Sequence, residues 1–212
     1  MRRLALLAAL GLVLVGCGGG PKVTQTRDVG PWTGIEVSGD VNVDVVPGDT
    51  REVVVTGGKD VLDRVHTVVE DDVLHIAIKD RGIVIGPDPF DGVRVRVSAA
   101  ALSTIRVQGS GDLELGRIDT DELTIEVVGA ADIQASGTVD TLTLNVEGAG
   151  DADLGDLEAR TARVVVQGAG DAELNVRDEL DVTVQGAGDV TYRGNPSVRQ
   201  RVEGAGEVRP ED

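Results

Sequence analysis

The chain has 212 residues and a formal net charge of −17 at pH 7, and it contains one Cys, one Trp, one Tyr and one Phe. This acidity excludes electrostatic binding to nucleic acid or to an anionic lipid surface, because both would repel the chain. The single cysteine excludes an internal disulfide, and so few aromatic residues argue against an extended cleft that stacks on sugar rings.

Residues 1–16 have the features of an export signal. Two arginines precede an apolar run that is too short to span a bilayer as a helix. The run ends in Leu-Val-Gly followed by Cys17, which resembles a bacterial lipobox with cleavage before the cysteine. We therefore predict that residues 1–16 are a lipoprotein signal peptide and that Cys17 is the lipidation site. The alternative is an ordinary signal with an incidental cysteine.

Within residues 17–30, three glycines and a proline follow Cys17 and the rest is a polar stretch, which predicts a flexible tether. Two or three acyl chains on Cys17 would anchor the protein stably. Gly18, rather than aspartate, follows the cysteine, and this resembles the sorting pattern of outer-membrane lipoproteins. The sequence thus predicts an exported cell-envelope lipoprotein at the outer membrane, held there through its N-terminal lipid. The domain would face either the periplasm or the outside.

Residues 31–100 predict a β-rich but irregular first portion of a single domain that spans residues 31–212. Two alternating runs, 66–70 and 73–78, are joined by two acidic residues and predict an antiparallel hairpin. The segment from Arg81 to Gly92 predicts the longest irregular loop. A strand restarts at Val93 and is expected to lead into the segment that follows.

Residues 101–210 predict regular rungs, because one pattern recurs six times at steps of 18 to 20 residues. The copies are IRVQGSGDLEL from Ile105, LTIEVVGAADIQA from Leu123, LTLNVEGAGDADL from Leu142, ARVVVQGAGDAEL from Ala162, LDVTVQGAGDVTY from Leu180 and VRQRVEGAGEVRP from Val198. Apolar and polar residues alternate before each glycine, which is typical of a strand with one buried face. A fixed period of this length without room for a helix indicates a stacked solenoid.

The fold class that follows is all-β, a right-handed parallel β-helix with an N-terminal portion that contains the hairpin. We expect the right hand because parallel crossovers nearly always have it. Stacked coils would lie about 4.8 Å apart along the axis.

An acidic residue occupies the same turn position in every copy. The column is Asp112, Asp132, Asp151, Asp171, Asp189 and Glu207, with Asp40 and Asp60 as further candidates. Carboxylates one rung apart repel each other by about 0.9 kcal/mol per pair even in the dielectric of water, so something must compensate. One hypothesis is that each carboxylate accepts backbone N–H groups of its own turn. The other is a bound cation, of which Ca²⁺ is the best match to oxygen ligands.

No catalytic residue, metal centre or cofactor is predicted. His66 and His75 would lie on one face of the hairpin in diagonal positions, but no third ligand is evident. We interpret both as solvent-facing strand residues.

These motifs resemble the GIN-domain family, whose description is the auto-transporter adhesin head domain and whose members are commonly bacterial lipoproteins. The resemblance rests on WTGIEVSGDVNV from Trp32, the segment 55–62, the EDDVLHI hairpin and the G-x-G-D rungs, and it covers about residues 31–208. Trp32 stands where the family usually has Phe, and Glu207 replaces Asp. The resemblance implies a parallel β-helix and an adhesin role.

We therefore expect a non-enzymatic adhesion or ligand-binding protein that takes a surface carbohydrate or a protein. One alternative is a polysaccharide lyase or hydrolase, since β-helices host such enzymes. Another is a structural envelope protein that assembles end to end through unpaired strand edges. A monomer is expected, because Gln200 interrupts the core pattern and charged residues crowd the last rung.

Overall fold

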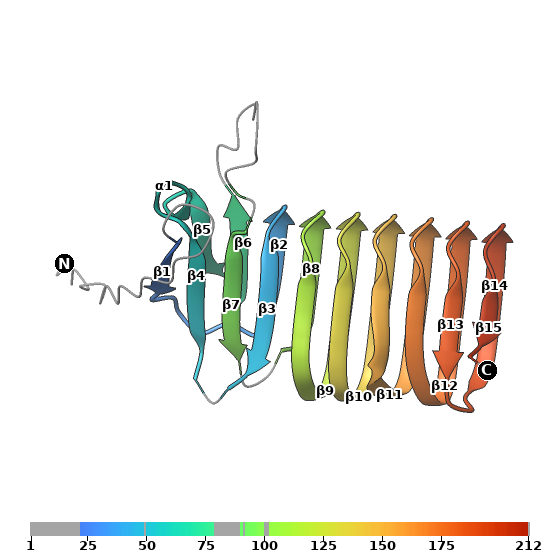
Figure 1. Cartoon of the computed structure of the whole chain (residues 1–212). Coiled ribbons are helices and arrows are strands. Elements are labelled where there is room, and N and C mark those ends of the chain that lie inside the picture. Colours follow the sequence, from blue (N-terminus) through green and yellow to red (C-terminus); the bar gives the residue numbers. More distant parts are fainter. Residues whose placement is uncertain (1–21, 49, 79–89, 91, 100–101, 212) are drawn as a thin grey trace.

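The strands form one continuous sheet that coils into an elongated solenoid (Figure 1). The computed structural model describes residues 22–48, 50–78, 90, 92–99 and 102–211. The predicted signal peptide, Cys17 and most of the loop predicted between Arg81 and Gly92 lie outside the described residues. In the described part of the chain, no helix is long and apolar enough to cross a membrane.

The elements in chain order are β1 (Lys22–Arg27), β2 (Gly34–Gly39), β3 (Asn42–Pro47), β4 (Glu52–Gly58), α1 (Lys59–Leu62), β5 (Val65–Glu70), β6 (Val73–Ile78), β7 (Arg94–Ala99), β8 (Thr104–Gly109), β9 (Leu113–Gly129), β10 (Ile133–Gly148), β11 (Ala152–Gly168), β12 (Ala172–Gly186), β13 (Val190–Arg193), β14 (Ser197–Gly204) and β15 (Val208–Pro210).

From β8 onward the chain forms a parallel β-solenoid, as the repeat predicts. The long strands β9, β10, β11 and β12 each pair in parallel with the next, and the coils follow one another along the axis in chain order (Figure 1). Gly129, Gly148 and Gly168 are direct neighbours in this register. The predicted all-β parallel β-helix is confirmed. The predicted hairpin is also confirmed, as the antiparallel pair β5 and β6.

The inward-facing residues form apolar columns that run along the whole stack. One column is Leu74, Ile35, Ile105, Ile125, Leu144, Val164 and Val182, all of them buried. Because alternate residues of a strand face the same side, the period-2 pattern places these residues in the core and their neighbours outside. Each coil contributes only a few apolar side chains, so the core depends on stacking.

The glycine at the end of each repeated strand permits close approach of successive coils. Gly168 has φ of +134°, and a Cβ at this position would lie 2.0 Å from the carbonyl oxygen of Gly148. Any residue other than glycine would therefore have a strained backbone and a steric overlap at position 168. The equivalent glycines have positive φ as well: Gly109, Gly129, Gly148, Gly186 and Gly204.

In the N-terminal portion, the order of the strands in space differs from their order in the chain. β2 and β3 pair in parallel with β8 and β9, and so form the coil next to the repeats. β6 and β7 stack on the far side of that coil, with β5, β4 and β1 attached antiparallel beyond them. The strand expected at Val93 to lead into the repeats is thus β7, but it packs between β3 and β4. The register of Gly39 with Gly109 shows why β2 fits beside the repeats: it ends in the same glycine turn.

Part of the tether predicted over residues 17–30 requires a correction, because Lys22–Arg27 forms β1 and pairs with β4, while residues 17–21 lie outside the described residues. The Oγ1 atoms of Thr24 and Thr56 lie 3.1 Å apart across this pair. Arg27 donates a hydrogen bond from Nη2 to the carbonyl oxygen of Leu62, at 2.8 Å. A short polar segment of this kind gives no strand signal alone, and its contacts with β4 and α1 hold it in place.

Candidate functional site

The predicted acidic column exists as one line of turn residues along the solenoid. Asp112, Asp132, Asp151, Asp171, Asp189 and Glu207 each stand immediately before or at the start of the second strand segment of a coil. The two further candidates are not members. Asp60 lies in α1, and Asp40 occupies the position of Ser110, which donates a hydrogen bond to it. The column position in the N-terminal coil belongs instead to Asn42, whose side-chain oxygen accepts the N–H of Asp112 at 3.1 Å.

Successive rungs are joined by hydrogen bonds from main-chain N–H groups to these carboxylates. The N–H of Asp151 donates to Oδ1 of Asp132 at 3.1 Å, and the N–H of Asp171 donates to Oδ1 of Asp151 at 2.9 Å. The same contact follows from Asp189 to Asp171 at 2.7 Å, and from Glu207 to Asp189 at 2.9 Å. The capping hypothesis expected each carboxylate to accept N–H groups of its own turn. The carboxylates instead accept an N–H group from the turn of the next rung.

A second bond runs in the opposite direction at the same place. The N–H of Ala152, directly after Asp151, donates to the carbonyl oxygen of Asp171 at 2.9 Å. Each junction from Asp132 to Glu207 is thus held by one bond to a carboxylate and one to a carbonyl. A hydrogen bond to a charged group contributes about 1.5–3 kcal/mol. Even the low end of this range exceeds the ~0.9 kcal/mol repulsion between neighbouring carboxylates.

This ladder has one gap, beside the first repeat. Among the described residues, no hydrogen bond joins the N–H of Asp132 to the carboxylate of Asp112. A surface groove of about 310 Å³ lies at this point. It is lined by Asn42, Asp44, Arg94, Asp112, Leu113, Glu114, Asp132 and Gln134. NH1 of Arg94 donates to both carboxylate oxygens of Asp44, at 3.0 and 3.1 Å.

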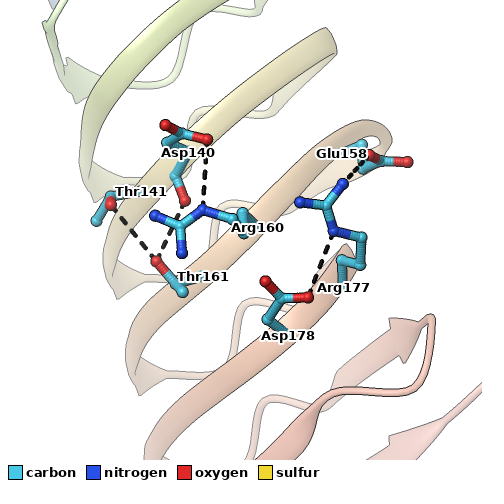
Figure 2. A network of polar contacts seen from close by, with 7 residues as sticks. All are labelled: Asp140, Thr141, Glu158, Arg160, Thr161, Arg177 and Asp178. Carbon is cyan, nitrogen blue, oxygen red and sulfur yellow. Dashed lines mark hydrogen bonds and ion pairs between the residues drawn. The ribbon is translucent and has the colours of Figure 1, made fainter.

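A second polar network lies at another corner of the coils (Figure 2). Arg160 Nε donates to Asp140 Oδ1 at 3.4 Å, and Thr161 Oγ1 donates to the carbonyl oxygen of Asp140 at 3.2 Å. On the following rung, Arg177 lies between Glu158 at 3.6 Å and Asp178 at 3.4 Å. These bonds tie β10, β11 and β12 together at the rim of a groove of about 250 Å³.

A third groove, of about 420 Å³, lies against β11, β12 and β14. Arg163 and Arg199 flank Asp181 there, with nitrogen-to-oxygen distances of 3.7 and 4.0 Å. Thr161, Glu179 and Ser197 add polar groups to its lining. The groove can therefore hydrogen-bond a polar ligand, although its ion pairs are exposed.

A line of charged residues crosses the outer face near the N-terminal end. His75 Nδ1 lies 3.4 Å from Glu36, whose other oxygen lies 3.5 Å from Arg106, and Arg106 Nε lies 2.6 Å from Glu126. The hydrogen bond that Arg106 donates to Glu126 raises the pKa of Arg106 above its ordinary value. Val68, not His66, is directly opposite His75 in the hairpin, which confirms the diagonal placement of the two histidines.

No group of three or more His, Cys, Asp and Glu side chains among the described residues is arranged to hold a metal ion. The three grooves are lined by carboxylates, guanidinium groups, amides and hydroxyls, and none of them contains His or Cys. Sequence reasoning missed Asn42 as the first member of the column. The sequence does carry a pattern that could have identified it, because Asn42 is followed by the same alternation of apolar and polar residues as the aspartates of the column.

Comparison with known proteins gives a family match and several similar folds. Residues 31–196 match the family model described as "Putative auto-transporter adhesin, head GIN domain". A structure called a "putative adhesin" from Bacteroides fragilis is 21% identical with a TM-score of 0.72, and covers 91% of this chain and 98% of its own. A "putative lipid binding protein" from Parabacteroides distasonis is 19% identical with a TM-score of 0.54, and covers 92% and 98%.

A "putative adhesin" from Parabacteroides merdae is 18% identical with a TM-score of 0.56, and covers 92% of this chain and 98% of its own. At these identities the likeness shows the fold alone. No curated protein matches the sequence.

Proposed function

The chain belongs to the family described as "Putative auto-transporter adhesin, head GIN domain", and we propose that it is a lipid-anchored cell-envelope protein with a non-enzymatic role in adhesion or ligand binding. The family match carries this proposal, since it spans the N-terminal sheet and most of the solenoid. The polar grooves favour a surface carbohydrate or a protein as ligand, because their carboxylates, guanidinium groups and hydroxyls can exchange hydrogen bonds with either.

The proposed anchor is a lipid on Cys17, with the outer membrane as the destination. Cys17 precedes β1 by five residues in the sequence. β1 and β15 lie at opposite ends of the strand order. A lipid at Cys17 would therefore hold the molecule by one end and leave the long faces of the solenoid open to a ligand (Figure 1).

The anchor is tested by Cys17→Ser. We expect this substitution to abolish acylation and to move the protein from the membrane fraction to the soluble fraction, because charge alone cannot hold so acidic a chain to the membrane. Fractionation and intact-mass measurement provide the readout. Gly19→Ser serves as the matched control and should stay acylated. Membrane retention of the Cys17→Ser protein would refute the anchor.

The adhesive role is tested separately by exposure on intact cells. A protease site inserted after Gly194, in the exposed turn between β13 and β14, should be cut by protease added outside the cells. A periplasmic marker protein must survive the same treatment. Protection of the inserted site in intact cells, with cleavage after lysis, would place the domain in the periplasm and remove the adhesin role.

A further inference from the structure

The strand β14 leaves the inner face of the last coil open. All eight of its residues are exposed, including Val198 at 36% and Val202 at 39%. Their neighbours one coil earlier, Leu180 and Val184, are 1% and 0% exposed. The charged residues near this end do not cover Val198 and Val202. These two valines occupy core positions but are open to solvent, because no further coil among the described residues is stacked on them.

β14 also has a free strand edge. Within the described residues it pairs only with β12, in parallel, so the main-chain groups along its other edge have no strand partner. Such an edge can accept a further strand, and the new strand would gain both ladder hydrogen bonds and contact with the exposed valines.

Gln200 identifies which strand fits. It continues the core column Ile105, Ile125, Leu144, Val164 and Val182, and it is the polar member of that column. A second copy of β14 running antiparallel, with Gln200 at the two-fold axis, would place Gln200 opposite Gln200 of the partner subunit. A carboxamide carries both donors and an acceptor, so two of them can bond each other reciprocally.

We propose that β14 binds β14 of a second copy of this chain, antiparallel and centred on Gln200. In this register Val198 lies opposite Val202 of the partner subunit, and Val202 lies opposite Val198 of the partner subunit. The four valines then close the open core, and the paired amides fix the register, as a buried polar residue does in coiled coils. This pairing needs no lipid anchor and stands apart from the proposed function.

The outward-facing residues of β14 permit this register. Arg199 would lie near Arg201 of the partner subunit, but each arginine is already paired within its own chain. Arg201 lies 2.6 Å from Glu203, and Arg199 lies 4.0 Å from Asp181. A register centred on Arg201 would instead place Arg201 opposite Arg201 of the partner subunit and Val202 opposite Gln200 of the partner subunit. This register opposes like charges and mismatches polar and apolar side chains, so the register centred on Gln200 is favoured.

Disulfide trapping tests both the partner and the register. The full chain carrying Cys17→Ser is purified from the soluble fraction, so that an introduced thiol is the only one. Gln200→Cys should form a covalent dimer under mild oxidation, because directly opposed Cα atoms lie about 4.5–5.5 Å apart, within disulfide range. Val202→Cys is the matched control, since its two thiols would be offset by roughly 13 Å along the strands. The Gln200→Cys protein should cross-link at least about tenfold faster than the Val202→Cys protein, because pairing raises the effective concentration of the opposed thiols.

A second measurement uses the chain without introduced thiols. Sedimentation should show a dimer that becomes a monomer with Val198→Lys and Val202→Lys together. Val128→Lys, which changes an equally exposed valine on β9, should leave the dimer intact. Equal cross-linking rates for both cysteine variants, or a monomer before substitution, would each overturn the proposal.

Discussion

At the scale of single residues, the acidic turn position acts as a connector between coils. Asp151 is exposed, yet it makes two hydrogen bonds to neighbouring rungs: its main-chain N–H donates to the carboxylate of Asp132, and its own carboxylate accepts the N–H of Asp171. The acceptor role requires an oxygen but no negative charge. The same reasoning accounts for Asn42, an amide that accepts the N–H of Asp112 at the start of the column.

The first prediction concerns Asp151. Asp151→Asn should cost little stability, because the amide oxygen can still accept the N–H of Asp171. Asp151→Ala should cost about 1.5 kcal/mol, the low end of the net contribution of a hydrogen bond to a charged group. Thermal melts of both variants and of the unchanged chain, each with calcium and with chelator, provide the measurement. If the column held calcium, chelator would lower the melting temperature of the unchanged chain and the two substitutions would be equally harmful; we expect neither.

At the scale of the strand, the alternation of inner and outer positions governs tolerance to substitution. Val166 is fully buried and continues the column formed by Val127, Val146 and Val184. Val165, the adjacent residue, faces outward between Asn145 and Thr183. Two valines next to each other in one strand therefore have different roles.

The second prediction compares these two valines. Val166→Asp buries an unpaired carboxylate inside the stack, which should cost several kcal/mol and prevent folding. Val165→Asp places the same carboxylate on the outer face, where Val165 is only partly buried, and should leave the fold intact. Soluble yield and far-ultraviolet circular dichroism of the two proteins distinguish them. Similar behaviour of the pair would contradict the register of β11.

At the scale of the whole molecule, stability comes from contacts between neighbouring coils. β10 pairs with β9 on one side and β11 on the other, and β12 pairs with β11, β13 and β14. Each coil thus depends on its immediate neighbours, as in other repeat proteins. The solenoid should then tolerate changes in the number of coils better than changes of register within one.

The third prediction is a deletion of one coil. Removal of residues 149–168 joins Gly148 to Ala169 and brings β10 beside β12 in the register that β11 had with each of them. We expect a folded, shorter solenoid with the β signal retained in circular dichroism. Removal of residues 149–158 alone takes out half a coil and should abolish folding. A folded half-coil deletion, or an unfolded whole-coil deletion, would contradict nearest-neighbour stacking.

The sequence alone determined the coils of this protein, whereas the tertiary structure decided how the ends are built and what the turns bond to. The alternation before Gly168 and the recurrence of the same pattern at Gly148 and Gly186 are local features, so they predicted the inner face, the turns and the stacking partner together. The N-terminal strands lack this shared pattern, and which of them pair is set by long-range contacts. Hence part of the predicted tether is the strand β1, and β2 rather than β7 lies beside β8. For the same reason the sequence placed Asp151 at a turn but could not identify its acceptor contact with Asp171, because that N–H reaches it only when the next coil is stacked.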